Sequence, residues 1–130
     1  MARRTFASDD VARPRGPYSS VTSCGPLVTT AGIVGTGVDG VLVEGLEEQV
    51  HASMRNMMAA LRAAGAVETD IVAVNVFLAD GEHVDRMNAV FTEWVHEPFP
   101  ARTTIVAGLR AGVLFEINAT AYVTETEGIH

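Results

Sequence analysis

The chain has 130 residues, of which 48% are hydrophobic and 19% charged, a composition typical of one globular domain and unlike that of a disordered protein. Its formal net charge of −7 argues against nucleic acid as the main partner, because proteins that bind phosphate backbones usually present a basic face. All nine of its Lys and Arg residues are arginine, so a mechanism through a lysine Schiff base is excluded.

The cysteine and histidine content and the apolar segments indicate where the protein works and whether it needs a metal. The single cysteine, Cys24, excludes an intrachain disulfide and favours a reducing compartment, so we expect a cytoplasmic protein. The N-terminus has no apolar core of a secretory signal, and residues 26–43 contain six Gly, Pro and Asp residues, so no membrane contact is expected. The four histidines lack ligand spacing, and we expect no metal. One domain is expected over 1–130, with 1–14 and 124–130 less ordered.

The first half of the chain predicts a β-hairpin, a loop and a long helix. Residues 19–25 and 26–34 read as two short strands joined by a turn at Gly25-Pro26. The loop at 35–40, GTGVDG, has the spacing of a nucleotide-binding glycine motif, but the helix starts about six residues too late for phosphates to meet its N-terminus. Apolar residues at helical spacing then predict a helix that stops at Gly65: Leu46, Val50, Met54, Met57 and Leu61.

The second half predicts a strand, a helix and two more strands. Residues 70–80 are apolar on both faces except at Asn75, which indicates a central strand. A helix is expected from about 81 to 96, ended by two prolines, with this inner face: Val84, Met87, Phe91, Trp94 and Val95. The last strands, 101–109 and 113–123, are expected to be joined by Arg110-Ala111-Gly112. The order ββαβαββ predicts an α+β fold with two helices on one face of a mixed sheet.

The face of the last strand that points away from the helices carries several polar residues. Its odd positions, from Val113 to Val123, are all apolar and should meet the helices, whereas its even positions are half polar. If a three-residue turn makes the last two strands a hairpin, Arg102 and Glu116 share that half-polar face, about 13 Å apart along the strands; a two-residue turn would separate them. Such a face commonly packs against another subunit. The two side chains can then serve one substrate if they converge, if a bulge shortens the gap, or if they come from adjacent subunits.

Several motifs, in order and spacing, resemble the Rid family of reactive-intermediate (imine/enamine) deaminases over about residues 15–123. The most specific are Phe99-Pro100-Ala101-Arg102 and Phe115-Glu116-Ile117. The others include Gly16-Pro17-Tyr18-Ser19, Thr30-Ala31-Gly32, Phe77-Leu78-Ala79-Asp80 and Met87-Asn88-Ala89-Val90-Phe91. The resemblance implies a chorismate-mutase-like fold with a mixed six-stranded sheet, and a homotrimer with clefts between subunits.

The resemblance also implies a role for eight positions. Arg102 ends the Pro-Ala-Arg motif and would hold a substrate carboxylate, for which its planar fork of donors is suited. Glu116 would orient or activate water for attack on the C=N carbon. The substrate pocket would further contain Tyr18, Ala31, Gly32, Ile33, Asn88 and Thr104. For Asn88, an amide on the inward edge of a helix is more often bonded to backbone. The chemistry needs no cofactor.

Two departures from the family pattern leave the substrate open. Ala31-Gly32-Ile33 stands where Ser-Gly-Gln is usual, and Leu109-Arg110 where Leu-Pro is usual. We expect a hydrolytic deaminase that converts 2-imino or 2-enamine acids to 2-oxo acids and ammonia. The alternatives are a non-catalytic trimer that senses small carboxylates, and a pathway-specific member for a bulkier or less polar imine. A ribonuclease, a label sometimes attached to this family, is disfavoured by the acidic charge and the lack of an aromatic-basic patch.

Overall fold

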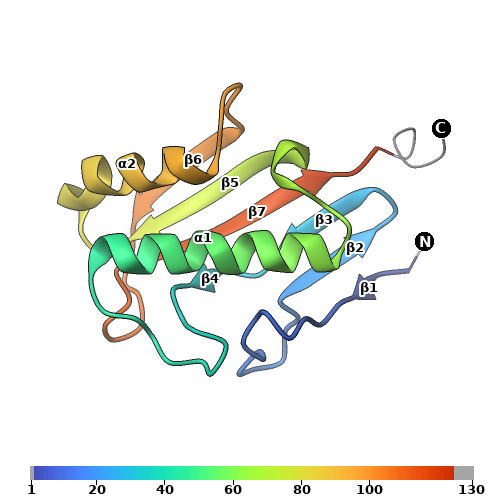
Figure 1. Cartoon of the computed structure of the whole chain (residues 1–130), viewed down its shortest axis with the longest axis horizontal. Helices are drawn as coiled ribbons and strands as arrows, with labels where there is room; N and C mark the ends of the chain where they lie inside the picture. The colour runs from blue at the N-terminus through green and yellow to red at the C-terminus, as the bar shows by residue number, and fades with distance from the viewer. Residues whose placement is uncertain (1, 125–130) are drawn as a thin grey trace.

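Two α-helices lie side by side on one face of a mixed β-sheet in the computed structural model, which describes residues 2–124 (Figure 1). The helices are α1 (Leu46–Ala63) and α2 (Val84–Trp94), with single 3-10 turns η1 (Glu68–Asp70) and η2 (Gly81–His83). The strands are β1 (Arg4–Thr5), β2 (Val21–Cys24), β3 (Leu27–Thr30), β4 (Ile33–Val34), β5 (Ile71–Leu78), β6 (Ala101–Val106) and β7 (Phe115–Tyr122). The predicted α+β class is confirmed.

Six strands form the path β1-β2-β3-β7-β5-β6 across the described part of the sheet, and the short β4 pairs with β7 beside it. The predicted elements contained five strands, and the family resemblance implied six. The additional strands are β1 and β4, and β4 arises because the second predicted run breaks at Ala31-Gly32 and then returns to the sheet. No helix within residues 2–124 is long and apolar enough to cross a membrane.

The N-terminal strands form the predicted hairpin. Cys24 lies opposite Leu27, and Gly25 takes the left-handed conformation with a φ of 59° that the tight turn requires. Arg4 and Thr5 extend the sheet by pairing with β2, so this part of the segment expected to be less ordered belongs to the fold. Residues 125–130 of the expected C-terminal tail lie outside the described residues.

The core lies between α1, α2 and the inner face of the sheet. The predicted stripe of α1 is buried along its whole length, and Gly65, with a φ of 87°, follows the end of the helix as predicted. The odd positions of the last strand face the helices as expected, and Phe115, Ile117 and Ala121 are completely buried. Burying each large side chain of this kind contributes roughly 1.5–3 kcal/mol relative to leaving it exposed. The inner face of α2 is more mixed, because Met87, Phe91 and Val95 are buried but Val84 and Trp94 only partly so.

The last two strands do not form the predicted hairpin. β6 runs parallel to β5, and β5 runs antiparallel to β7, so β5 separates the two strands and is central as predicted. The expected three-residue turn is part of a longer loop, residues 107–114, that crosses the end of β5. Ala107 donates to the Leu78 carbonyl at 3.0 Å, and Ala79 donates to the Leu114 carbonyl at 3.1 Å. Parallel strands need a crossover connection, and α2 supplies it between β5 and β6.

Candidate functional site

Arg102 and Glu116 lie on opposite faces of the sheet. Residues paired across neighbouring strands project to the same side. Arg102 is paired with Val74, which is buried beneath the helices, whereas Glu116 is paired with Phe77 on the open face. The expectation that the two residues share one face was wrong, because β6 pairs with β5 in parallel and makes no hairpin with β7.

The Arg102 guanidinium is supported by α2. Its Cζ lies 5.0 Å from the centroid of the Phe91 ring, and its Nη1 lies 4.0 Å from the Met87 sulfur. This partial burial lowers the pKa of Arg102, although a guanidinium stays protonated at neutral pH. No carboxylate within residues 2–124 forms an ion pair with it. Arg102 therefore presents a positive charge that apolar neighbours position and no acid in the described chain neutralises.

Two other predicted pocket residues accompany Arg102 at the β6 edge. Thr104 lies two residues further along β6, on the same face, and is half-buried. Asn88 follows Met87 on α2, and the carbonyl oxygen of its side chain is buried without a hydrogen-bond partner in the described chain. The bond to backbone that we favoured for Asn88 is therefore not made by this atom.

Glu116 is half-buried on the open face, where its carboxylate lies against the backbone of Gly32. A Cβ added to Gly32 would collide with Oε2 of Glu116, so this position has no room for a side chain. β4 sets this contact, since Val34 is paired with Glu116 and Gly32 immediately precedes the strand. No cation within residues 2–124 forms an ion pair with Glu116.

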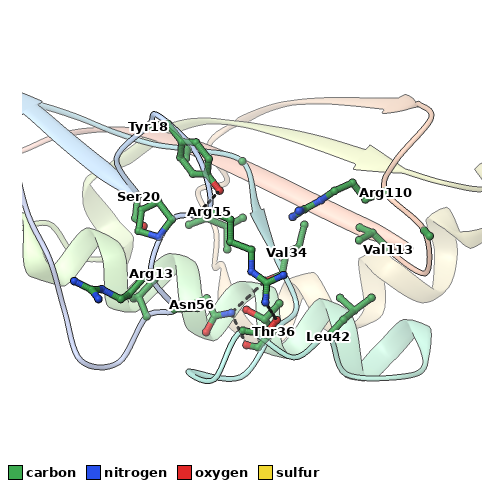
Figure 2. A pocket seen from close by; sticks show the side chains of 18 residues that line it. Arg13, Arg15, Tyr18, Ser20, Val34, Thr36, Leu42, Asn56, Arg110 and Val113 are labelled. Atoms are coloured by element: carbon green, nitrogen blue, oxygen red, sulfur yellow. Dashed lines mark hydrogen bonds between the residues drawn. The ribbon is translucent and has the colours of Figure 1, made fainter.

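The other predicted pocket residues line a cavity of about 530 Å³ next to β4 (Figure 2). They are Tyr18, Ala31, Gly32 and Ile33. Tyr18 is half-exposed, and its hydroxyl accepts a hydrogen bond from the backbone N–H of Arg15 at 3.4 Å. The structure thus divides the eight predicted residues into two groups. One surrounds Glu116 and this cavity, and the other surrounds Arg102 at the β6 edge.

Two buried amides of α1, one heptad apart, fix the loops around the cavity. Gln49 donates to the carbonyls of Val43 and Gly112, at 3.0 and 2.9 Å, and accepts from the Leu114 N–H at 2.8 Å. In the same way, Asn56 donates to two carbonyls at 3.1 and 2.8 Å, those of Val34 and Thr36. Sequence reasoning gave neither residue a role, and their signal was a pair of uncharged polar residues seven positions apart on a helix.

Sequence reasoning also did not assign three arginines that line the same cavity to the site. Arg13 and Arg15 line it together with Arg110, which the sequence showed only as a departure from a family pattern. The available signal was the triplet Arg13-Pro14-Arg15 directly before the Gly-Pro-Tyr motif. Within residues 2–124 no group of three or more His, Cys, Asp or Glu side chains is placed to hold a metal ion.

Comparison of the sequence with known protein families identifies the family. The family model described as Endoribonuclease L-PSP matches residues 10–123. The chain belongs to this family. A RutC family protein of Pyrococcus abyssi is 34% identical over 125 residues, covering 94% of this chain and 98% of that protein. The human family member named 2-iminobutanoate/2-iminopropanoate deaminase is 31% identical over 124 residues, covering 93% and 90%.

A solved structure of the family confirms the fold and the resemblance to Rid proteins. RidA from an Antarctic Psychrobacter bacterium superposes with a TM-score of 0.88 and 32% sequence identity, covering 92% of this chain and 99% of that one. The likeness therefore extends over nearly the whole chain, including both groups of candidate site residues.

Proposed function

We propose that this chain is a hydrolytic deaminase that converts 2-imino and 2-enamine acids to 2-oxo acids and ammonia. The observation that carries the proposal is a pair of opposite charges without ion-pair partners in the described chain, Arg102 and Glu116. The first suits a substrate carboxylate, and the second suits a water molecule that needs a base. The names of relatives 31–32% identical, from human and Salmonella typhimurium, support imine chemistry.

The opposite-face arrangement determines how such a site can be assembled. One chain cannot place both Arg102 and Glu116 on one small substrate, because the sheet lies between them. We therefore place the site between subunits of a homotrimer, with Arg102 from one chain and Glu116 from its neighbour. Exposed apolar side chains on the sheet strands support an interface there. They are Leu27, Val72, Ile105 and Tyr122, each 45–51% exposed.

The proposed reaction balances without a cofactor. Arg102 holds the carboxylate, which fixes the C=N carbon in the cleft. Water adds to that carbon while Glu116 accepts one of its protons and passes it to the imine nitrogen, which gives a carbinolamine. The hydroxyl proton is then transferred to the amino nitrogen, again through Glu116, as the C–N bond breaks. Ammonia is released, and the remaining product is a 2-oxo acid. An enamine enters the same route after protonation at its β-carbon.

The family description names an endoribonuclease, yet two observations favour the deaminase. The chain carries a net charge of −7, which opposes binding to an RNA backbone. Relatives from Dermatophagoides farinae, human and Salmonella typhimurium are named 2-iminobutanoate/2-iminopropanoate deaminase. The single cysteine remains our reason to propose the cytoplasm as the compartment.

Hybrid trimers test the proposal. Arg102→Lys and Glu116→Gln chains are assayed for ammonia release from a freshly generated 2-imino acid, each alone and then after co-refolding in equal amounts. With dilute substrate each pure variant should be strongly impaired, since one lacks the planar fork and the other lacks the base. In random hybrid trimers about one quarter of the sites combine an intact Arg102 with an intact Glu116, so about one quarter of wild-type activity should return.

Two results would overturn the assignment. Hybrids that stay inactive, despite mixed trimers detected by mass spectrometry, would show that the two residues do not meet across an interface. A wild-type chain that binds 2-oxo acids but releases no ammonia would indicate a carboxylate sensor. The control is a refolded wild-type sample, which must regain its activity and a mass about three times 13.8 kDa.

A further inference from the structure

The cavity beside β4 is lined by arginines and by none of the acidic residues that the structure describes. Arg13, Arg15 and Arg110 contribute to its wall, whereas no Asp or Glu within residues 2–124 does, although the chain carries a net negative charge. None of the three arginines forms an ion pair within residues 2–124. Three cations around one hollow repel one another unless an anion neutralises them. The cavity therefore has the charge of an anion-binding site within an acidic protein.

The arginines differ in where their guanidinium groups lie. Figure 2 shows Arg15 and Arg110 extending into the cavity from opposite sides, while Arg13 points away from its centre. Arg15 Nη2 donates to the Gly40 carbonyl at 3.2 Å, which fixes the side chain with most of its five donors unused. Arg110 makes no side-chain bond within the described residues. Arg15 and Arg110 are thus the two groups available to a ligand.

The loop that carries Arg110 is held in place before any ligand arrives. The Arg110 carbonyl accepts a hydrogen bond from Val113 at 2.9 Å, which closes a turn. Gln49 binds the same loop at Gly112 and Leu114. A preorganised loop loses less conformational entropy when it binds an anion, and so contributes more affinity.

The cavity adjoins the reacting end of the proposed active site. Tyr18, Ala31 and Gly32 belong to its wall, and the Glu116 carboxylate lies against Gly32. A substrate whose imine carbon is near Glu116 can therefore extend its side chain toward Arg15 and Arg110. Its 2-carboxylate would meanwhile contact Arg102 of the neighbouring subunit. The two anion sites thus serve different ends of one molecule.

We propose that Arg15 and Arg110 bind a second anionic group, so that the preferred substrates are imino acids with a carboxylate or phosphate on the side chain. This inference rests on the proposed deaminase function. It gives a role to Arg110, which stands where the family pattern has proline, since a guanidinium supplies paired donors for an oxyanion.

Substrate preference tests the proposal. Imines of alanine and of glutamate are generated by an amino acid oxidase, and kcat/KM is measured for wild type and for Arg110→Leu. The wild type should prefer the glutamate imine, and Arg110→Leu should lower that preference by about tenfold or more, because a charge-assisted fork is lost. Arg55→Leu, an exposed arginine of α1 outside the cavity, is the matched control and should keep the preference. The proposal would be overturned if the wild-type kcat/KM values for the two imines were nearly equal, or if their ratio were unchanged in Arg110→Leu.

A binding experiment separates this proposal from the deaminase itself. Titration calorimetry measures 2-oxoglutarate, 2-oxobutanoate and inorganic phosphate against wild type and Arg110→Leu. Tighter binding of 2-oxoglutarate that weakens in the variant supports the cavity even if no imine is hydrolysed, whereas equal binding of both oxo acids rejects it even if imines are hydrolysed. Binding of phosphate indicates a phosphorylated substrate. If Arg110→Leu dissociates the oligomer and weakens both oxo acids equally, Arg110 pairs with an acid of the neighbouring subunit and the proposal is wrong.

Discussion

The Glu116 carboxylate lies so close to Gly32 that a single added methyl group at Gly32 would displace it. The contact fixes the carboxylate by backbone shape alone, since Glu116 has no ion-pair partner in the described chain. The obstructing atoms are the flexible end of a side chain, which can move without disturbing the core. The contact thus couples the backbone at Gly32 to the position of the proposed base.

Gly32→Ala should reduce turnover and leave stability nearly unchanged. A displaced base no longer meets the attacking water, so kcat should fall by about tenfold or more. The melting temperature should shift by less than about 3 °C, because only a half-exposed side chain moves. Ammonia release and a thermal melt on the same sample check both expectations. Normal turnover in this variant would show that the position of Glu116 is unimportant.

Gly35→Ala is the matched control, because we expect it to lower stability, whereas Gly32→Ala should lower turnover. A Cβ at Gly35 would meet the backbone Cα and carbonyl oxygen of Gln49, at 2.8 and 2.6 Å, and the backbone of α1 cannot yield as a side chain can. Overpacking of this kind costs about 1–3 kcal/mol, so this variant should melt at a lower temperature. Equal loss of stability in both glycine variants would contradict the distinction.

Arg102→Lys should lower substrate affinity without lowering stability. Lysine keeps the charge but loses the planar fork, which costs on the order of 1–3 kcal/mol of binding to a carboxylate. Binding of a 2-oxo acid, deaminase activity and the melting curve are measured together. Near-normal activity would remove Arg102 from the substrate site, and a joint loss of activity and stability would make it a structural charge.

Arg86→Lys provides the comparison for that experiment. Arg86 also uses its fork, with Nε and Nη2 at 2.7 and 2.8 Å from the carboxylate of Glu47, but it joins α2 to the start of α1. Its replacement should leave deaminase kinetics unchanged.

The Glu47–Arg86 pair should weaken between about pH 4.5 and pH 2. The hydrogen bonds from Arg86 lower the pKa of Glu47 from 4.5 to about 2. A carboxyl whose pKa is lower in the folded state stabilises the fold above its unfolded pKa and loses that effect as the pH falls through its folded pKa. Urea unfolding of wild type, Glu47→Gln, Arg86→Met and the double variant gives the coupling energy at each pH. A coupling energy that does not change over this range would refute the assignment.

Gln49→Leu should loosen the loop that carries Arg110. The change leaves two buried carbonyls and one N–H without their partner, which costs about 2 kcal/mol or more. Hydrogen exchange should increase at residues 42–44 and 110–114. Asn56→Leu is the control, since it should increase exchange near 34–36 instead. Increased exchange over the whole chain in Gln49→Leu would indicate general destabilisation and would contradict a specific role of Gln49 in holding this loop.

The pattern of apolar residues was enough to predict the layers of the fold. The stripe from Leu46 to Leu61 is buried, and the odd positions of the last strand face the helices. Both could be predicted because side chains on one face recur about every 3.6 residues in a helix and every two residues in a strand, whatever the rest of the fold. The partner of β6 was not predictable in this way. Its pattern indicates a strand but not a neighbour, and the short Arg110–Gly112 segment resembled a hairpin turn. The helix between β5 and β6 was the better signal, since it is the connection that parallel strands need.

The candidate site was predictable as a set of residues but not as a geometry. The assignment of Arg102 and Glu116 to the site stays a prediction from motifs, and their opposite faces followed only from the strand pairing. Arg15 was missed because the Arg13-Pro14-Arg15 triplet lies in a loop without periodicity, which does not show where its side chains point. Only the fold brings it to the same cavity as Arg110, 95 positions later in the chain.

Gln49 and Asn56 hold their loops by bonds to main-chain atoms only. Main-chain carbonyls and N–H groups are the same for almost every amino acid, so mutations in these loops need not disturb the ties. Side chains such as Arg110 can therefore be exchanged during evolution while the loop stays in place. A scaffold of this kind lets a lineage change what it recognises by single substitutions, and it makes residues 107–114 a suitable segment for redirecting specificity by directed evolution.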